Sequence, residues 1–412
     1  MIKTKLFERL GIVYKMVRKY GLLKYIGWLK YLSIYFAAAI VSPFLKHKKR
    51  FQHLWIICER GVDARDNGYH LFRYIRENHP EVNIVYIISK DSVDFKKINS
   101  LGKFVGYKTF LHYVYLILSE VKISTHVMGY APKTNLFVQL NRLSLLSGKQ
   151  IYIKHGIIYS DIVSSHYPRV QFDLLVCAAI PEYKFILENF GHPAHCIQLL
   201  GLARYDALLQ NQVSKSKQIL LMPTWRTFLD NVSTEEFVGS DYYQFFNHLF
   251  NCKSLCDLLE RKGYTLVFYL HFNFQRFLPA FSSSSDRVIF ASFDKYDVQQ
   301  LLIESDVLIT DFSSVCFDFA YMKKPEIYIQ FDKKEFRAHH QKMGYFDHDR
   351  DGFGPVVENE NDLISALDTI LQNGAEMEEI YRLRVDRFFT IRDTNNCKRI
   401  YEAIEKIVLK DL

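Results

Sequence analysis

Residues 306–322 read Asp-Val-Leu-Ile-Thr-Asp-Phe-Ser-Ser-Val-Cys-Phe-Asp-Phe-Ala-Tyr-Met. The run 306–310 is short and apolar, as is typical of a buried parallel strand, and 313–322 has the composition of a buried helix. Polar residues stand at the junction, where the strand ends and the helix begins at once. The stretch therefore predicts one strand–helix unit of a doubly wound α/β fold.

The same alternation continues in both directions along the chain. Strands are expected at 53–58, 82–89, 121–126, 150–154, 174–178, 197–201, 218–222, 264–270, 287–290 and 326–330. Helices are expected at 67–78, 108–120, 242–261 and 298–304. Strands that alternate with helices form parallel sheets covered on both faces. Two such blocks predict two facing Rossmann-like domains, with a polar linker at 211–217 and the predicted units 1–50, 51–211 and 212–412.

The composition is that of a globular protein with large cores. The chain has 412 residues, which predicts two or three domains, and 49% of them are hydrophobic. Seven scattered cysteines, several inside apolar runs, indicate buried free thiols in the cytoplasm rather than disulfides or a zinc site.

The first fifty residues are basic and rich in aromatic side chains, and the chain carries a net charge of +8. This pattern favours a segment that lies on an anionic membrane surface. A helix packed on the body of the protein would give the same pattern, and nucleic acid is a weaker third option because no binding module follows. The longest apolar run, 31–45, has about fifteen residues and contains Pro43, so no membrane-spanning helix is expected.

Polar residues follow three strands of the second half. Ser313 and Ser314 begin a helix directly after a strand, an arrangement that suits a phosphate, although serines also serve simply as helix caps. Arg226, in the segment Met-Pro-Thr-Trp-Arg, follows a second strand and is a natural phosphate partner. His271 follows a third strand, where a lone histidine is more often structural than catalytic.

In the first half, the strand 150–154 runs into His155 and Gly156. A histidine at this place suits general-base catalysis near neutral pH, and Asp161 is a candidate to orient it. Arg204 closes this half near the expected cleft. Together these residues indicate phosphate chemistry between two domains without identifying the substrate.

Other nucleotide-binding patterns are missing or weak. The sequence has no Walker GxxxxGK[ST] motif and no GxGxxG after a strand, so kinase, ATPase and NAD-enzyme functions lose their main support. The segment 347–351, Asp-His-Asp-Arg-Asp, has the D-x-D spacing of metal-dependent glycosyltransferases. It follows no clear buried strand, so an acidic surface or lid loop is the favoured interpretation.

Six motifs in order give the chain a specific resemblance. It resembles the CDP-glycerol glycerophosphotransferase family of teichoic-acid and capsule biosynthesis over roughly residues 53–360. The motifs are Ala-Arg-Asp-Asn-Gly-Tyr-His-Leu-Phe-Arg-Tyr-Ile-Arg-Glu-Asn-His-Pro (64–80), Lys-His-Gly-Ile-Ile (154–158), Met-Pro-Thr-Trp-Arg (222–226), Ile-Thr-Asp-Phe-Ser-Ser-Val (309–315), Met-Lys-Lys-Pro (322–325), and Gly-Tyr-Phe-Asp (344–347) with Asp-Gly-Phe-Gly-Pro (351–355).

The resemblance implies a glycosyltransferase-B-like fold, a CDP-polyol donor, and no metal or cofactor. It implies that His155 is the general base and that His271 stabilises charge on the donor diphosphate. The implied donor site comprises Arg226, Thr224, Asp311, Ser313 and Ser314, and the implied acceptor or phosphate side comprises Asp161, Arg204 and Asn67. Two departures stand out: Phe272 follows His271 where the family often has proline, and 157–161 lacks the usual Thr-Pro-Leu-Lys continuation.

The resulting hypothesis is transfer of glycerol phosphate from CDP-glycerol to a hydroxyl of a lipid-linked polymer, with release of CMP. The enzyme would work on the inner face of the cell membrane, bound to it through residues 1–50. CDP-ribitol or another CDP-linked donor stays open, as does a non-catalytic scaffold for capsule assembly. Sugar transfer or epimerisation on a nucleotide-sugar suits the fold but fits these motifs poorly.

Overall fold

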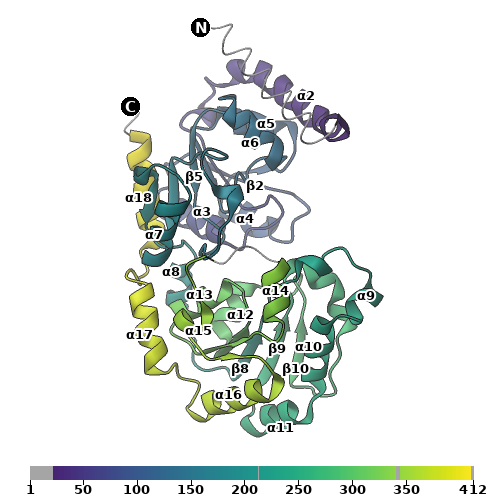
Figure 1. Cartoon of the computed structure of the whole chain (residues 1–412). Helices are drawn as coiled ribbons and strands as arrows, with labels where there is room; N and C mark the ends of the chain where they lie inside the picture. Colours follow the sequence, from purple (N-terminus) through teal and green to yellow (C-terminus); the bar gives the residue numbers. More distant parts are fainter. Residues whose placement is uncertain (1–21, 212, 340–343, 410–412) are drawn as a thin grey trace.

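The computed structural model describes residues 22–211, 213–339 and 344–409. Figure 1 shows two α/β units. The chain passes from the first to the second through α8 (Tyr205–Gln210). Each unit is built on one parallel sheet, and the strands of both sheets end toward the junction between the units. This arrangement confirms the predicted fold class of two facing Rossmann-like domains.

The first sheet has seven parallel strands in the order β3-β2-β1-β4-β5-β6-β7. Their bounds are β1 Trp55–Cys58, β2 Ile84–Ile88, β3 Phe104–Gly106, β4 Val121–Ser124, β5 Lys149–Tyr152, β6 Leu174–Cys177 and β7 Ile197–Leu199. The helices of this unit are α3 Asn67–Asn78, α4 Phe95–Leu101, α5 Phe110–Leu118, α6 Thr134–Arg142, α7 Ile180–Asn189 and α8. The predicted helix 67–78 is found with the same bounds.

The second sheet has six parallel strands in the order β10-β9-β8-β11-β12-β13. Their bounds are β8 Gln218–Leu221, β9 Thr265–Tyr269, β10 Val288–Ala291, β11 Val307–Thr310, β12 Glu326–Ile329 and β13 Val356–Val357. The helices are α9 Thr234–Val238, α10 Asp241–Asn251, α11 Lys253–Lys262, α12 Val298–Glu304, α13 Val315–Tyr321, α14 Lys333–His339, α15 His348–Asp351, α16 Glu360–Gln372 and α17 Glu379–Phe388.

Two differences from the predicted elements have local causes. The edge strands β3 and β13 escaped prediction because they contain only three and two residues. The predicted helix 242–261 is two helices, since Cys252 between them has an extended backbone (φ −72°, ψ 134°). Side chains that are buried on both faces of β11 explain why its sequence is continuously apolar.

The last helix, α18 (Asn396–Leu409), leaves the second unit and packs on the first. Its apolar face, including Ile400 and Ile404, belongs to the same buried cluster as Trp55 of β1 and Leu71 of α3. The two backbone N–H groups at its start are bound by the Asp206 carboxylate. The second predicted unit, 212–412, included this helix, whereas its packing joins it to the first sheet.

The N-terminal helix α2 spans Leu22–Leu45 and packs against α5. Of the predicted segment 1–50, residues 1–21 lie outside the described residues. Within α2, the stretch Gly27–Leu45 is long and apolar enough to cross a membrane by length and composition. The expectation that no helix spans a membrane rested on the uncharged run 31–45, whereas this longer stretch includes one charged residue, Lys30.

Candidate active site

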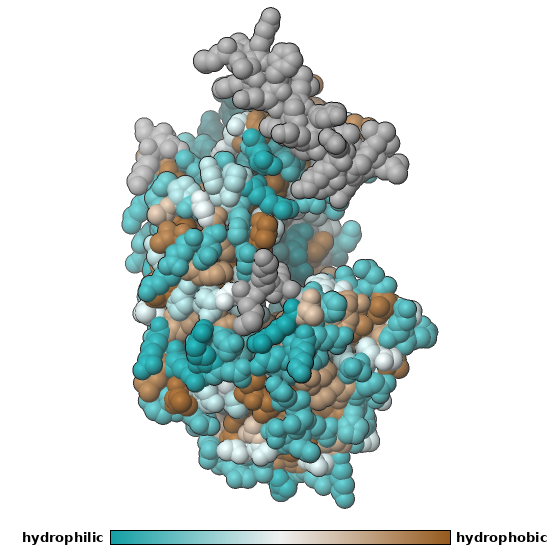
Figure 2. Space-filling view, viewed as in Figure 1, coloured by the Kyte–Doolittle hydropathy of each residue, from teal (hydrophilic) through white to brown (hydrophobic). Residues whose placement is uncertain are grey.

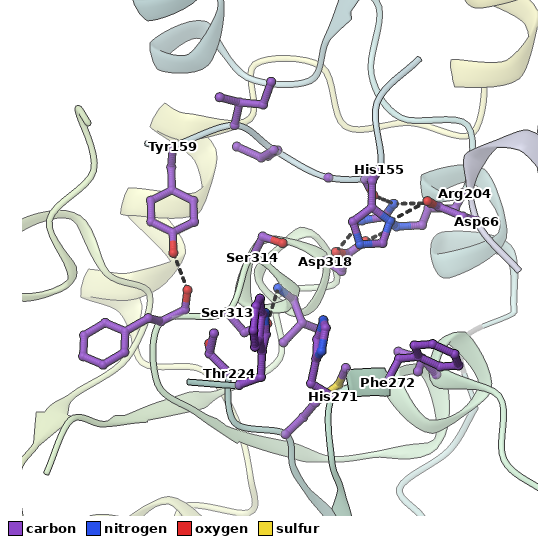
Figure 3. A pocket seen from close by; sticks show the side chains of 18 of the residues that line it. Asp66, His155, Tyr159, Arg204, Thr224, His271, Phe272, Ser313, Ser314 and Asp318 are labelled. Carbon is purple, nitrogen blue, oxygen red and sulfur yellow. Dashed lines mark hydrogen bonds and ion pairs between the residues drawn. The ribbon is translucent and has the colours of Figure 1, made fainter. Parts of the chain in front are cut away.

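One cavity lies between the two units where the strands of both sheets end (Figure 3). Its volume is about 530 Å³, within the range usual for small-molecule sites. Polar and aromatic residues of both units line it, namely Arg60, Asp66, His126, His155, Tyr159, Arg204, Thr224, Trp225, His271, Phe272, Ser313, Ser314 and Asp318. The predicted cleft is thus present, and most of the predicted site residues lie in it.

His155 has the arrangement of a general base. Its Nδ1 lies 2.6 Å from Asp66 Oδ2, and because a carboxylate only accepts, Nδ1 carries the hydrogen. The neutral imidazole then has its lone pair on Nε2, and the side chain is 66% exposed. Burial by itself would raise the pKa of the Asp66 carboxyl, but the neighbouring His155 and Arg204 outweigh it and hold that pKa well below its ordinary value.

A buried ion pair holds the turn that carries His155. Lys154, just before it, has a left-handed backbone (φ +57°) and pairs through Nζ with Glu182 of α7, with both side chains fully buried. The Glu182 carboxylate also accepts the backbone N–H of Ile158 at 2.6 Å. The Lys154 carbonyl accepts from Asn67 Nδ2 at 2.9 Å. The histidine therefore stands on a turn that is tied down on both sides.

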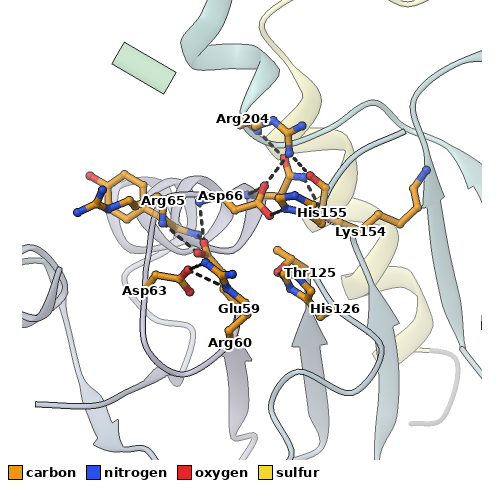
Figure 4. Close-up of polar contacts among 12 residues, drawn as sticks. Glu59, Arg60, Asp63, Arg65, Asp66, Thr125, His126, Lys154, His155 and Arg204 are labelled. Atoms are coloured by element: carbon orange, nitrogen blue, oxygen red, sulfur yellow. Dashed lines mark hydrogen bonds and ion pairs between the residues drawn. The ribbon is translucent and has the colours of Figure 1, made fainter. Parts of the chain in front are cut away.

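Arg204 joins the two units beside the histidine: Figure 4 shows its contacts with Asp66 and His155, and Figure 3 shows it beside Asp318. Its Nη1 donates to Asp66 Oδ1 at 2.6 Å and to the His155 carbonyl. Its Nε and Nη2 donate to the two carboxylate oxygens of Asp318, on α13 of the second unit, at 2.6 and 2.8 Å. Its backbone N–H is bound by Asn67 Oδ1 at 3.0 Å. Arg204 thus lines the cavity, Asn67 lies behind it, and both position the Asp66–His155 pair.

Asp161 does not have the place that the sequence suggested. Its Oδ1 lies 2.7 Å from His166 Nε2, away from His155. The carboxylate that orients the general base is Asp66, which precedes α3 and is 89 residues from His155 in sequence. The structure therefore moves the orienting role from Asp161 to Asp66.

On the opposite wall, His271 follows β9 and faces the cavity. Its Nδ1 accepts the backbone N–H of Asn273 at 3.3 Å, which puts the ring hydrogen on Nε2. Burial, followed by the nearby His155 and Arg60, lowers the pKa of His271 to about 4. The imidazole is therefore neutral at pH 7 in the free protein, and it offers a hydrogen-bond donor rather than a full charge.

Ser313 and Ser314 line the cavity just before α13. The Ser313 hydroxyl accepts the Val315 N–H at 3.4 Å, and Ser314 makes no side-chain capping bond. α13 has seven residues, so any help from a helix dipole is small. The two hydroxyls are the groups here that are best placed to reach a ligand.

Arg226 and Asp311 form part of the core rather than of the cavity wall. Both side chains are 0% exposed, and Arg226 Nη2 lies 2.9 Å from Asp311 Oδ2. Asp311 Oδ1 also accepts from Thr224, from its N–H at 2.7 Å and its Oγ1 at 2.6 Å. The prediction that Arg226 and Asp311 contact donor phosphate is therefore not supported by their placement, and their role is to fix the loop that presents Thr224.

Several cavity residues were not predicted from the sequence, among them Arg60, Asp66 and His126. The ring of His126 stacks on that of His155 with centroids 5.2 Å apart, and burial, with His155 second, lowers the pKa of His126 to about 3. Arg60 lies two residues beyond the end of β1 and His126 two residues beyond the end of β4, so each occupies the kind of strand-end position that singled out His155. That position was the available signal. Asp66 also lay inside a recognised motif.

The acidic segment 347–351 is used locally. Asp347 caps α15, Asp349 pairs with Lys333 at 2.7 Å, and Asp351 pairs with Arg350 at 2.6 Å. Within the described ranges, no group of three or more His, Cys, Asp or Glu side chains is placed to share a metal ion.

Two parallel sheets with a cavity between their strand ends define a fold of the glycosyltransferase-B class. The solved structure of the wall teichoic acid polymerase TagF superposes with a TM-score of 0.65 at 17% identity, over 95% of this chain and 97% of that one. A UDP-GlcNAc 2-epimerase from Neisseria meningitidis superposes with a TM-score of 0.52 at 12% identity, over 86% of this chain and 99% of that one. At these identities the likeness concerns the fold alone.

Sequence comparison finds relatives of higher identity than these structures, and it identifies the family. The chain belongs to the CDP-glycerol:poly(glycerophosphate) glycerophosphotransferase family, whose model matches residues 40–406. It is 35% identical over 364 residues to the minor teichoic acid biosynthesis protein GgaB of Bacillus subtilis, covering 85% of this chain but 39% of GgaB. It is 30% identical over 190 residues to a teichoic acid glycerol-phosphate transferase of Staphylococcus aureus, 46% of this chain and 45% of that protein.

Proposed function

We propose that this protein transfers glycerol phosphate from CDP-glycerol to a hydroxyl of a lipid-linked, teichoic-acid-like polymer and releases CMP. The observation that carries the proposal is the His155–Asp66 pair facing His271, Ser313 and Ser314 across one cavity. A base on one wall and hydrogen-bond donors on the other are what a phosphoryl transfer between two bound substrates requires.

In the proposed reaction, His155 Nε2 takes the proton of the acceptor hydroxyl while that oxygen attacks the phosphorus attached to glycerol. The new oxygen–phosphorus bond forms as the bond to the CMP oxygen breaks, and CMP leaves with the electron pair. Asp66 stabilises the imidazolium that results, because its carboxylate accepts the Nδ1 hydrogen. The Nε2–H of His271 and the serine hydroxyls would bind the diphosphate oxygens as charge moves to CMP.

The choice of glycerol rests on the family and on named relatives. The matching family model is described for glycerophosphate transfer, and the S. aureus relative is named as a glycerol-phosphate transferase. A ribitol-phosphate polymerase of Bacillus spizizenii matches at 31% identity, but over only 109 residues. CDP-ribitol is therefore the second donor to test.

The experiment is CMP release by the purified protein in EDTA. CDP-glycerol and CDP-ribitol are supplied separately, each with and without a lipid-linked acceptor. Acceptor-dependent release from CDP-glycerol supports the proposal, and release from CDP-ribitol alone would transfer it to the ribitol donor. Release from neither donor would contradict the proposal and favour the scaffold alternative.

We also propose that α2 binds the protein to an anionic membrane surface. The buried residues Trp28, Tyr35, Ala38 and Ser42 lie along one side of the helix, toward the first unit. Large apolar residues are exposed on the remaining surface: Leu29 59%, Phe36 51%, Ile40 71% and Phe44 79%. A helix with one face on the protein and an exposed apolar face suits the plane of the membrane interface.

Charge supports the same surface. Lys46, Lys48, Lys49 and Arg50 follow α2 directly and are exposed, and each cation near anionic lipid contributes about 1 kcal/mol. Figure 2 shows hydrophilic residues mixed with small hydrophobic patches over the second unit. Co-sedimentation with vesicles of phosphatidylglycerol should be lost in Ile40→Glu/Phe44→Glu and retained in a matched surface pair, Ile380→Glu/Leu383→Glu. Equal binding by both variants would contradict the proposal.

A further inference from the structure

Arg60 is a cation in the cavity that the proposed reaction leaves without a role. It lies two residues beyond the end of β1, lines the cavity, and its side chain is 39% exposed. Its Nε donates to Asp63 Oδ2 at 2.9 Å, and its Nη2 donates to the same oxygen. Among the described residues Nη1 has no partner. The Asp63 contact therefore orients the guanidinium and leaves one of its edges open to a ligand.

The backbone of the loop that carries Arg60 is constrained at Gly61. Gly61 has a φ of +80°, and a Cβ at that position would lie 2.4 Å from the Tyr107 ring. The Gly61 carbonyl accepts the Ser89 N–H at 2.7 Å, and the Asp63 side chain is only 7% exposed. Arg60 is thus held in place before any ligand binds, which reduces the entropy that binding would cost.

Phe272, a residue of the second unit, packs against the Arg60 guanidinium. The Phe272 ring lies 5.0 Å from the Arg60 Cζ, within the distance of a cation–π contact, and Phe272 is 47% exposed. Phe272 also packs edge-on against Phe293, with centroids 5.0 Å apart. This is the position where the resemblance noted above departs from the family, which often has proline, and a proline offers no aromatic face to a guanidinium.

The sheet order places Arg60 relative to the base. Strands β1, β4 and β5 are neighbours, and Arg60, His126 and His155 stand at or just beyond their ends. Neighbouring strands are about 4.8 Å apart, so two spacings separate the end of β1 from that of β5 by about 10 Å. Both side chains line the same cavity, so an acceptor bound there with its hydroxyl at His155 can have its next phosphodiester near Arg60.

We propose that Arg60, seated on Phe272, binds the terminal phosphodiester of an anionic acceptor, so that the site selects acceptors ending in polyol phosphate over neutral ones. The inference rests on the proposed function and names its acceptor class. An acceptor is assigned, rather than the donor, because Arg60 belongs to the same unit and strand-end row as the base. The groups proposed for the donor diphosphate, Ser313, Ser314 and His271, belong to the other unit.

The test compares two acceptors in the full-length protein. One is a lipid-linked primer ending in glycerol phosphate, and the other is the same lipid ending in a neutral glycerol. Arg60→Gln should raise KM for the phosphate primer by about 10- to 100-fold, as expected for loss of a hydrogen bond between charged groups. It should leave KM for the neutral primer and for CDP-glycerol within about twofold, so that selectivity between primers is lost.

The chain offers a matched control in Arg276, an exposed arginine outside the cavity. Its Cζ lies 4.5 Å from the Phe277 ring, so it makes a similar contact elsewhere. Arg276→Gln should behave as the wild type with both primers. Phe272→Leu should give a loss of the same kind as Arg60→Gln but smaller, and Arg60→Lys should recover part of the affinity.

Three results would overturn the inference: unchanged primer selectivity in Arg60→Gln, an equal loss with both primers, or a raised KM for CDP-glycerol instead. A second measurement keeps it separate from the proposed function. Fluorescence anisotropy of a labelled glycerol-phosphate oligomer, without donor, should show about tenfold weaker binding to Arg60→Gln than to Arg276→Gln. If the wild type releases no CMP, the proposed function fails while this binding result still decides the role of Arg60.

Discussion

Two arginines of this molecule make almost the same contacts in different places. Arg204 holds both oxygens of Asp318, at 2.6 and 2.8 Å, and contacts a second carboxylate, Asp66. Arg226 holds both oxygens of Asp332, at 2.5 and 2.8 Å, and contacts a second carboxylate, Asp311. Each follows a strand end by a few residues, so the local sequence describes them alike.

What differs is the surroundings. Arg204 links the two units beside His155, at the wall of the cavity. Arg226 stays inside the second unit, 0% exposed, with its Cζ 4.9 Å from the Phe336 ring and 5.1 Å from the Tyr242 ring. The same kind of ionic cluster therefore positions the His155–Asp66 pair beside the cavity in one region and lies inside the core in the other. The following predictions test that division.

In the cavity region around Arg204, we expect a substitution to lower activity without lowering stability. His155→Ala should lower kcat by about 10²–10⁴-fold, the usual contribution of a general base. The side chain is 66% exposed, so the urea midpoint of unfolding should stay close to that of the wild type. Steady-state CMP release and urea denaturation measure the two quantities, with the exposed His195→Ala as control. Retained turnover would remove His155 from the role of base.

In the core region around Arg226, we expect a substitution to lower stability with little change in substrate binding. Arg226→Leu should lower the free energy of unfolding by about 3–5 kcal/mol, because it leaves Asp311 and Asp332 as buried charges without their partner. Urea denaturation followed by circular dichroism measures the loss. Material that remains folded should bind CDP-glycerol with a Kd near that of the wild type. A stable variant with a strongly raised Kd would place Arg226 in the donor site after all.

Asp66→Asn sharpens the cavity side further. The amide removes the negative charge that stabilises the imidazolium, so kcat should fall on the order of 10²-fold, less than in His155→Ala. A structural role alone would lower stability without changing the pH profile of kcat/KM. The measurement is that profile in both proteins, and a profile superimposable on that of the wild type would count against the orienting role.

Glu59, whose carboxyl lies beside the Asp66–His155 pair, should make the stability of the protein depend on pH. Burial, followed by Asp66 and Asp63, raises the pKa of Glu59 from 4.5 to about 8. The folded state then keeps a proton that the unfolded chain releases above pH 4.5, so the free energy of unfolding falls as pH rises from about 4.5 to about 8. The slope from this group is at most about 1.4 kcal/mol per pH unit. Urea denaturation between pH 5 and pH 8 should show it, and Glu59→Gln should flatten it.

The smallest effect is expected at Asp161, for which the structure and the sequence prediction give different partners. Asp161 pairs with His166 rather than with His155, so Asp161→Asn should change kcat by less than about twofold, as for a partly exposed pair. The assay is CMP release under saturating donor. A loss comparable to that of Asp66→Asn would return Asp161 to the orienting role that the sequence suggested.

Much of the fold was predictable because it follows from local periodicity. Short apolar runs such as 307–310 gave the buried strands, and amphipathic stretches such as 67–78 gave the helices, because a doubly wound sheet buries both faces of its strands. The shortest edge strands and the return of α18 to the first unit were not predictable in this way. They depend on packing between segments that are far apart in the chain.

By itself, the sequence determined the class of fold, the family and the strand-end positions where chemistry gathers, because hydrophobic period and motif order are local properties. Only the tertiary structure decided which of those strand-end side chains meet. Asp66 reaches His155 across 89 residues, and Arg226 turns into the core while Arg204 faces the cavity. The physical reason is that a side chain beyond a strand end has no periodic constraint, so its direction is set by the elements that pack around it.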